Sequence, residues 1–191
     1  MRKLIILGGI YAALSGFVLL RGGSQAPVRY IHPGGGDATP AGGVAAEWFQ
    51  AMKPYCNPVE VQTRHQWNPP PASLEGNGYS AACYALAGKI ERARNIILEV
   101  DPGDRWRAAG IVFGAGHSIA DAGDDLSAGP LMELVVEFWP NHYMALYHAG
   151  MARYMLGEHD RAAPHLKAFL DEYAADDGWR SNALAVLREI E

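Results

Sequence analysis

Large apolar residues recur at intervals of three or four positions along most of the chain after residue 74. This spacing places them on one face of an α-helix. No run of β-branched residues alternates with a period of two, the pattern that would indicate strands. The hydrophobic pattern therefore predicts an all-α protein.

The stretch before residue 74 has a weaker pattern. Val44, Trp48, Phe49 and Met52 share one side of a short predicted helix. Pro54 should end this helix, because proline lacks the backbone donor that a helix interior needs. Residues 57–77 are rich in proline and polar side chains, so we expect an irregular segment that covers the helices. The earlier residues 23–43 are dense in glycine and proline and are predicted to form a flexible linker.

The helical region repeats itself. Gly88 recurs as Gly123 and Gly157, at separations of 35 and 34 residues. Alanine follows each glycine five positions later, and a small residue precedes it by seven. These small residues are Ala93, Ala128 and Ala162 after the glycines, and Ala81, Gly116 and Gly150 before them. Small side chains let two antiparallel helices approach closely, and a glycine in the left-handed conformation ends the first helix of each pair.

This pattern resembles the tetratricopeptide repeat, in three copies over residues 74–108, 109–142 and 143–176. Arg153 departs from the family pattern, which has a tyrosine there, and Pro164 lies where it could kink the second helix of the last copy. Residues 179–191 resemble the helix that closes such arrays. The resemblance implies an α-solenoid of three helix pairs in residues 74–178 and a C-terminal capping helix. Residues 44–73 would contain an N-terminal cap.

In this family the first helix of each pair lines a groove that binds peptides or helices of partner proteins. The corresponding positions here are mostly aromatic or methionine, which suits an apolar and adaptable partner. The alternative is that several of these side chains pack between helices. The groove residues implied by the resemblance are Tyr79, Phe113, His117, Asp121, Met144, Tyr147, His148, Met151 and Met155.

Residues 4–20 form an unbroken uncharged stretch between Lys3 and Arg21. As a helix it would reach roughly 25 Å, the short end of what spans a bilayer. A cleaved secretory signal is the alternative, but Pro27 after the small-residue site disfavours cleavage. We therefore expect residues 1–22 to form an uncleaved transmembrane anchor. The charge balance orients the N-terminus to the cytoplasm of a bacterial inner membrane, and the remaining chain to the periplasm.

One face of this predicted span carries only small side chains, from Gly8, Ala12 and Gly16. Such a face lets another transmembrane helix pack closely, although glycine is also frequent in membrane helices generally. The two cysteines, Cys56 and Cys83, match no metal-binding spacing. In an oxidising compartment they are predicted to form a disulfide, and two buried free thiols are the alternative.

The remaining chemistry is sparse. A formal net charge of −5 indicates no basic surface for nucleic acid. His142 and His148, like His159 and His165, are six residues apart, so a helix turns their rings to nearly opposite sides. Since no zinc motif, nucleophile motif or cofactor fingerprint is present, we expect no metal, no cofactor and no enzymatic activity.

The sequence thus predicts a membrane-anchored scaffold, an accessory subunit of a membrane protein complex that binds its partner through an apolar groove. Two alternatives remain open at this stage. One is an anchored periplasmic chaperone or assembly factor. The other is an enzyme of unrecognised type, which a closed polar pocket with a metal among His117, His148 and Asp121 would favour.

Overall fold

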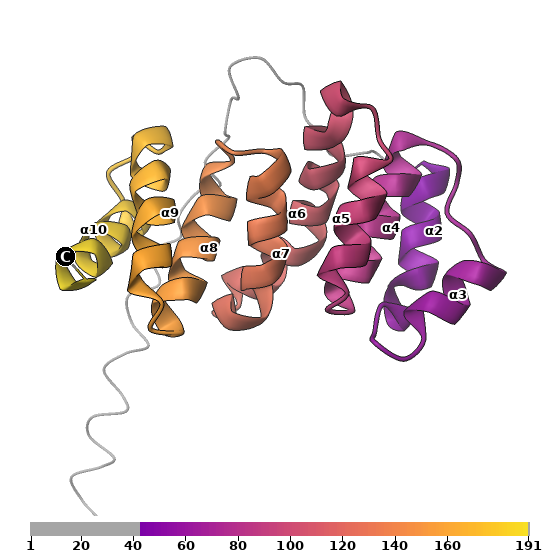
Figure 1. Cartoon of the computed structure of the whole chain (residues 1–191), viewed down its shortest axis with the longest axis horizontal. Coiled ribbons are helices and arrows are strands. Elements are labelled where there is room, and N and C mark those ends of the chain that lie inside the picture. Colours follow the sequence, from indigo (N-terminus) through magenta and orange to yellow (C-terminus); the bar gives the residue numbers. More distant parts are fainter. Residues whose placement is uncertain (1–42, 191) are drawn as a thin grey trace, which may run out of the picture. The chain divides into compact units, whose positions relative to one another are not determined.

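The structure is a computed structural model that describes residues 43–190, all within one compact unit, Asp37–Glu191. Every regular element in this described part is a helix, which confirms the predicted all-α class (Figure 1). The α-helices are α2 Val44–Met52, α3 Val61–Trp67, α4 Leu74–Leu86, α5 Ile90–Leu98, α6 Arg105–Asp121, α7 Asp125–Phe138, α8 Tyr143–Met155, α9 His159–Glu172 and α10 Gly178–Ile190. Two short 3-10 helices, η1 Lys53–Tyr55 and η2 Pro102–Asp104, complete them.

The three repeated glycines lie at equivalent bends between helices. Gly88 joins α4 to α5, Gly123 joins α6 to α7, and Gly157 joins α8 to α9. Their φ angles are 70°, 89° and 72°, and no other described residue has a positive φ. At each bend the glycine N–H donates to the carbonyl three residues back, and the next N–H donates to the carbonyl five residues before it. This pair of bonds is the Schellman motif, so the same local device ends the first helix of each pair.

The small residues before the bends sit where helices touch. A Cβ added at Gly116 would lie 2.7 Å from Leu131, and one added at Gly150 would lie 2.7 Å from Leu166. Both leucines belong to the following helix and are buried. The close approach that the sequence predicts within each helix pair is therefore present in the second and third pairs.

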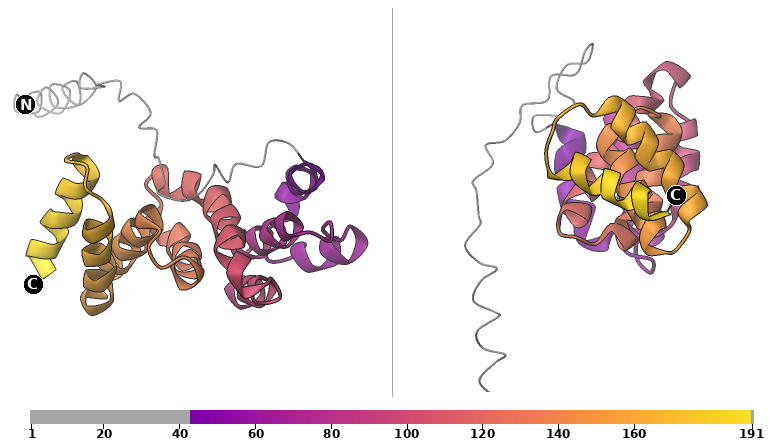
Figure 2. Two further views of the ribbon diagram at one scale, coloured as in Figure 1. Left: turned by 90° about the horizontal axis from the view of Figure 1, so that it is seen from above. Right: turned by 90° about the vertical axis from the view of Figure 1, so that its left-hand side faces the viewer.

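Consecutive helices pack side by side along the array. The main contacts are α4 with α5 and α6, α6 with α7, α7 with α8, and α8 with α9. The α2 and α3 helices lie at one end of this row and α10 at the other (Figures 1 and 2). The buried apolar side chains form two clusters. One extends from Trp48 to Ala149, and the second, from Leu146 to Leu187, joins α8 and α9 to α10.

Residues 57–77 are more ordered than the sequence suggests. The expectation of an irregular segment is wrong for Val61–Trp67, which forms α3. Val61 and His65, one turn apart, are its two buried residues, and the Asn57 side chain accepts hydrogen bonds from the N–H groups of Val59 and Glu60 just before it. A helix of seven residues with only two buried positions is too short for a helical spacing of apolar residues to be recognised in the sequence.

Proline does not interrupt the second helices. The α9 helix continues through Pro164, and α7 continues through Pro130. Both prolines come seven positions after a bend glycine, and both are exposed. The lost backbone hydrogen bond therefore faces solvent, where water can replace it.

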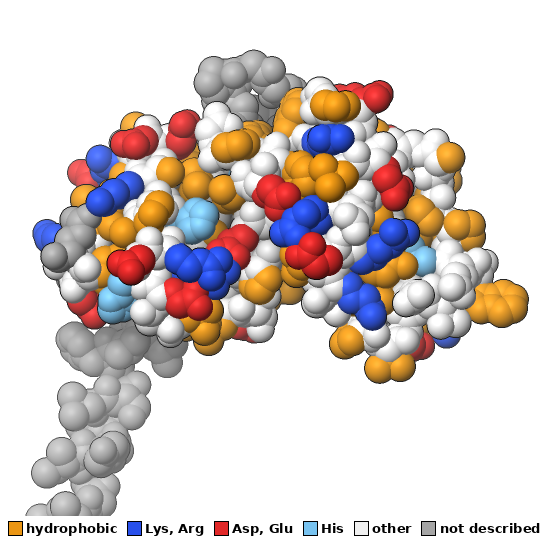
Figure 3. Space-filling view, viewed as in Figure 1, with side chains coloured by type: hydrophobic (Ala, Val, Ile, Leu, Met, Phe, Trp, Pro, Cys, Tyr) orange, Lys and Arg blue, Asp and Glu red, His pale blue; other side chains and the backbone are white. Residues whose placement is uncertain are grey.

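Ion pairs at the surface connect helices of neighbouring pairs. Arg94 on α5 contacts Glu137 on α7, with Nε 2.8 Å from Oε2. Arg153 on α8 makes a two-pronged contact with Glu133 on α7, and its Nη1 lies 2.6 Å from Glu158. Figure 3 shows acidic and basic side chains side by side on this face of the array. The arginine that departs from the repeat pattern thus bridges two helix pairs.

No helix within residues 43–190 has both the length and the apolar character needed to cross a bilayer. The predicted anchor in residues 1–22, its packing face of Gly8, Ala12 and Gly16, and the predicted linker up to residue 42 lie outside the described residues.

Candidate functional site

The predicted groove residues lie on the first helices of the three pairs, α4, α6 and α8. Their exposure differs. Met144, Tyr147 and His148 are buried. Tyr79, Phe113, His117 and Met151 are half-buried, whereas Asp121 and Met155 are exposed. We call Phe113, His117, Asp121, Met151 and Met155 the first-helix surface.

The terminal helices cover the two ends of the predicted groove. Phe49 on α2 stacks on Tyr79, with ring centroids 4.9 Å apart. On α10, the Asn182 amide donates to the Tyr147 hydroxyl at 2.6 Å. The Tyr154 hydroxyl in turn donates to Glu189 of α10 at 2.8 Å. The part of the groove between these covers is formed by α6 and the adjoining turns of α8.

Aromatic rings connect this middle part to the rest of the fold. Phe113 contacts His117 at a centroid separation of 4.4 Å and His142 at 4.0 Å. His142 also contacts Trp139, and Trp139 contacts Trp106 at 5.1 Å. Such ring pairs prefer offset or edge-on geometries and add rigidity to a surface. The first-helix surface is therefore held in place by aromatic contacts from α6 to α8.

Two histidines and two aspartates converge beside this surface. His148 Nδ1 lies 2.7 Å from Asp125 Oδ1, and His117 Nε2 lies 3.2 Å from Asp121 Oδ1. His148 Nε2 points to the same carboxylate at 3.9 Å. We call His117, Asp121 and His148 the histidine–aspartate cluster. Its three ligand-type atoms all lie within 4.8 Å of one another.

The chemistry of the cluster follows from its hydrogen bonding. An ionised carboxylate only accepts hydrogen bonds, so the proton of neutral His148 must sit on Nδ1, facing Asp125. Its Nε2 then carries a lone pair. The Nε2 atoms of His117 and His148 are buried, and neither makes a hydrogen bond among the described residues, since the 3.2 Å contact of His117 with Asp121 lacks hydrogen-bond geometry. Burial lowers the pKa of His117, Asp121 opposes this and His148 adds to it, so the lowered pKa favours neutral imidazole at His117.

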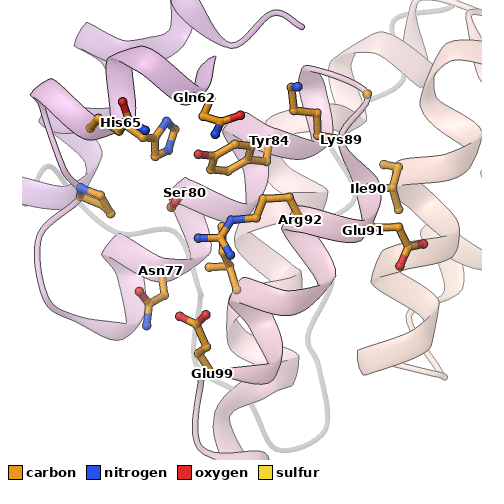
Figure 4. A pocket seen from close by; sticks show the side chains of 14 residues that line it. Gln62, His65, Asn77, Ser80, Tyr84, Lys89, Ile90, Glu91, Arg92 and Glu99 are labelled. Carbon is orange, nitrogen blue, oxygen red and sulfur yellow. The ribbon is translucent and has the colours of Figure 1, made fainter. Parts of the chain in front are cut away.

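A second feature is an open polar cleft of about 900 Å³ between α3, α4 and α5 (Figure 4). His65 lies on the α3 side of the cleft, and the Arg92 side chain extends into it between Tyr84 and Glu99. Charges of both signs line the cleft, from Lys89, Glu91, Arg92 and Glu99. Burial lowers the pKa of His65, and Arg92 adds to this, while the hydrogen bond to the Val61 carbonyl opposes it. The balanced charges favour no particular class of ion.

The predicted disulfide is present. Cys56 and Cys83 are bonded, with their Cα atoms 4.8 Å apart. The bond attaches the segment after α2 to the buried face of α4, and Cys83 itself is fully buried. The disulfide and the packing of α2 thus fix the N-terminal cover of the array.

Every member of the histidine–aspartate cluster is a predicted groove residue, and the sequence groups the three only as the metal site that would favour the enzyme alternative. Only the pair His117 and Asp121, four residues apart on one helix, is visible in the sequence. His148 comes from another repeat, and nothing in the sequence indicates that Asp125 is its hydrogen-bond partner. The lateral packing of α6 against α7 and of α7 against α8 brings the cluster together.

No protein-family model, curated protein or solved structure matches this chain.

Proposed function

We propose that this protein is a tetratricopeptide-type scaffold, anchored in the bacterial inner membrane by residues 4–20, whose periplasmic domain binds a partner protein. The partner would occupy the first-helix surface. Binding would hold it at the membrane, where attachment of both components raises their effective concentration.

One observation carries this proposal: the same Schellman bend ends α4, α6 and α8, at Gly88, Gly123 and Gly157. Repeated helix pairs of this kind cannot bury their faces alone, so they stack. Stacking leaves a continuous wall built from the first helices. Such walls are typical binding surfaces, whereas a catalytic pocket usually needs a closed cavity.

The character of the first-helix surface supports a protein partner. Phe113 and Met151 are half-buried, and Met155 has 49% of its surface exposed. Methionine adapts to different partner shapes, and fixed aromatic rings serve as anchors. A partner with an apolar helix or extended segment fits this chemistry. The Cys56–Cys83 disulfide supports an oxidising compartment, as expected outside the cytoplasm.

Site-specific photo-crosslinking of the full-length chain in its native membranes tests this proposal. A crosslinking amino acid at Phe113 or Met155 should trap a partner protein. The matched control is Leu98, an apolar residue on α5 with 42% exposure that lies outside the first-helix surface. Equal trapping from Leu98 and Phe113, or none from Phe113 and Met155, would contradict the proposal.

The same experiment separates a permanent subunit from a chaperone. A subunit should give one discrete crosslinked product and copurify in fixed stoichiometry after mild detergent extraction. Substitution of Gly8, Ala12 and Gly16 by leucine should then release the partner, because bulky side chains block close helix packing. A chaperone should crosslink to many clients and tolerate those changes.

A further inference from the structure

We propose that the histidine–aspartate cluster is a binding site for a divalent transition-metal ion, with Zn²⁺ as the best fit. His117, Asp121 and His148 would supply one ligand atom each. His117 and Asp121 also belong to the first-helix surface, but the three ligands come from this chain alone, so metal binding does not require the partner proposed above.

The donor set selects the class of ion. Two imidazole nitrogens and one carboxylate oxygen suit zinc and related first-row metals, whereas magnesium and calcium prefer oxygen ligands throughout. Three protein ligands leave a further position for water or for a side chain of a partner.

The spacing of the donor atoms fits such an ion. Zn²⁺ holds nitrogen and oxygen ligands at about 2.0–2.2 Å, which places tetrahedral neighbours roughly 3.4 Å apart. Asp121 Oδ1 lies 3.2 Å from His117 Nε2 and 3.9 Å from His148 Nε2. The third pair of donor atoms, the imidazole nitrogens of His117 and His148, lies within 4.8 Å. A small rotation of the partly exposed His117 or Asp121 side chain would bring the three donor atoms to tetrahedral spacing.

The buried histidine gives the site its preorganisation. The His148 side chain has 1% of its surface exposed, and its Nε2 has no hydrogen-bond partner in the described part of the chain. Leaving such an atom unpaired is costly, and a metal ion would satisfy it. Asp125 accepts from Nδ1 at 2.7 Å and orients the ring. A carboxylate behind a histidine ligand in this way is the usual support of a zinc-binding imidazole.

The surroundings allow an ion to enter. The Asp121 side chain is 47% exposed and that of His117 is 29% exposed, so the cluster opens to solvent on one side. On the other side the Trp179 ring of α10 lies 5.6 Å from the His148 ring. Asp121 within the cluster and Asp125 behind His148 give the site a negative charge that favours a cation.

Metal titration of the full-length chain, purified without a histidine tag and freed of metal by a chelator, tests the proposal. Zn²⁺ should bind at one ion per chain in competition with a chromophoric chelator, and excess Mg²⁺ should not displace it. Co²⁺ should give the visible absorption of a nitrogen- and oxygen-coordinated ion. A dissociation constant weaker than on the order of 0.1 mM for Zn²⁺ would overturn the proposal.

Variants assign the ligands. Asp121→Asn and His117→Gln should each weaken Zn²⁺ binding at least tenfold. Asp125→Asn should weaken it by about 10- to 100-fold, because it removes the support of His148. His165→Gln is the matched control, since His165 is also partly buried with its Nε2 3.9 Å from a carboxylate, that of Glu133, but lies outside the cluster. It should bind Zn²⁺ as the wild type does.

Circular dichroism and thermal unfolding of the metal-free variants show whether a variant that binds Zn²⁺ more weakly is still folded. Asp121 and His117 are chosen over the buried His148 for this reason. Wild-type affinity in both folded variants would show that zinc binds elsewhere and would overturn the proposal. If His165→Gln weakened Zn²⁺ binding as much as Asp121→Asn and His117→Gln do, the ligand assignment would be overturned as well.

Discussion

At the scale of single residues, the second and third helix pairs each have a position, Gly116 and Gly150, where an added Cβ would lie 2.7 Å from a leucine of the next helix. Gly150 on α8 faces Leu166 on α9, and an added Cβ would lie 2.7 Å from the Leu166 Cγ and 3.3 Å from the His165 Cβ. Leu166 is fully buried and has no room to move aside. By contrast, Gly114 on α6 is exposed, and nothing lies within 4 Å of its missing Cβ.

We expect Gly150→Ala to destabilise the protein and Gly114→Ala to stabilise it. Overpacking costs roughly 1–3 kcal/mol, which exceeds the gain of roughly 1 kcal/mol from replacing a helical glycine by alanine. At Gly114 no overpacking opposes this gain, so the free energy of unfolding should rise by about 0.5–1 kcal/mol. Urea unfolding of both variants measures these changes. A Gly150→Ala variant as stable as the wild type would refute the close approach.

Stability should also depend on the protonation of His65. Its ring contacts Trp48 and Tyr84, and burial with help from Arg92 lowers its pKa in the folded state below 6.5. The unfolded chain therefore binds more protons as the pH falls through 6.5, and stability declines between there and the folded pKa. We expect a loss of at most about 1.4 kcal/mol per pH unit from this group.

The free energy of unfolding at pH 7.5 and pH 5.5 measures this effect. His65→Phe keeps an aromatic ring but cannot titrate, so its stability should change less with pH than that of the wild type. The stability of His65→Phe should still change with pH, because burial also lowers the pKa of His165. Identical pH profiles for the variant and the wild type would rule out a role for His65.

At the scale of helices, ion pairs contribute where they are shielded from water. The Arg153 and Glu133 side chains, which link α8 to α7, are 16% and 24% exposed. Arg107 and Glu75 link α6 to α4 over 3.7 Å, but their side chains are 45% and 40% exposed. Both pairs join helices of the array, so they form a matched comparison of shielded and solvated contacts.

A double-mutant cycle with Arg153→Met and Glu133→Gln should give a coupling energy of about 1–3 kcal/mol. The corresponding cycle with Arg107→Met and Glu75→Gln should give less than about 1 kcal/mol, since exposed pairs are screened. Thermal or urea unfolding of the wild type and the six variants provides both values. Equal couplings would mean that shielding at the junction between helix pairs has no effect.

At the scale of the whole molecule, the disulfide ties the N-terminal cover to the array. Cys56 and Cys83 are separated by 27 positions. In the chain-entropy account, closing a loop of this length stabilises the folded state by about 3–4 kcal/mol. Replacing both cysteines by alanine should lower the free energy of unfolding by that amount.

Urea unfolding of the double variant and the oxidised wild type measures the difference. Reduction of the wild type by dithiothreitol should have the same effect, and it should leave the variant unchanged. A loss below about 1 kcal/mol would show that residues 57–77 are held by packing alone.

Much of the fold could be predicted because its signals are local. A bend glycine, the small residues around it and a helical period are readable within each copy, and the structure has helix bends at all three glycines. The short α3 helix was not predicted, because seven residues are too few to show the helical spacing of apolar positions. The groove assignment named the residues of the candidate site but not their burial, because the covers by α2 and α10 involve distant parts of the chain.

The sequence by itself determined that this chain is helical, where its helix pairs bend and which cysteines can pair, because backbone conformation and helix faces follow from neighbours a few residues apart. Only the tertiary structure decided which predicted groove residues stay accessible. It alone brought His148 of the third repeat to the His117 and Asp121 pair of the second. Residue spacing places a side chain on one face of its own helix, whereas the meeting of three side chains depends on how separate helices pack.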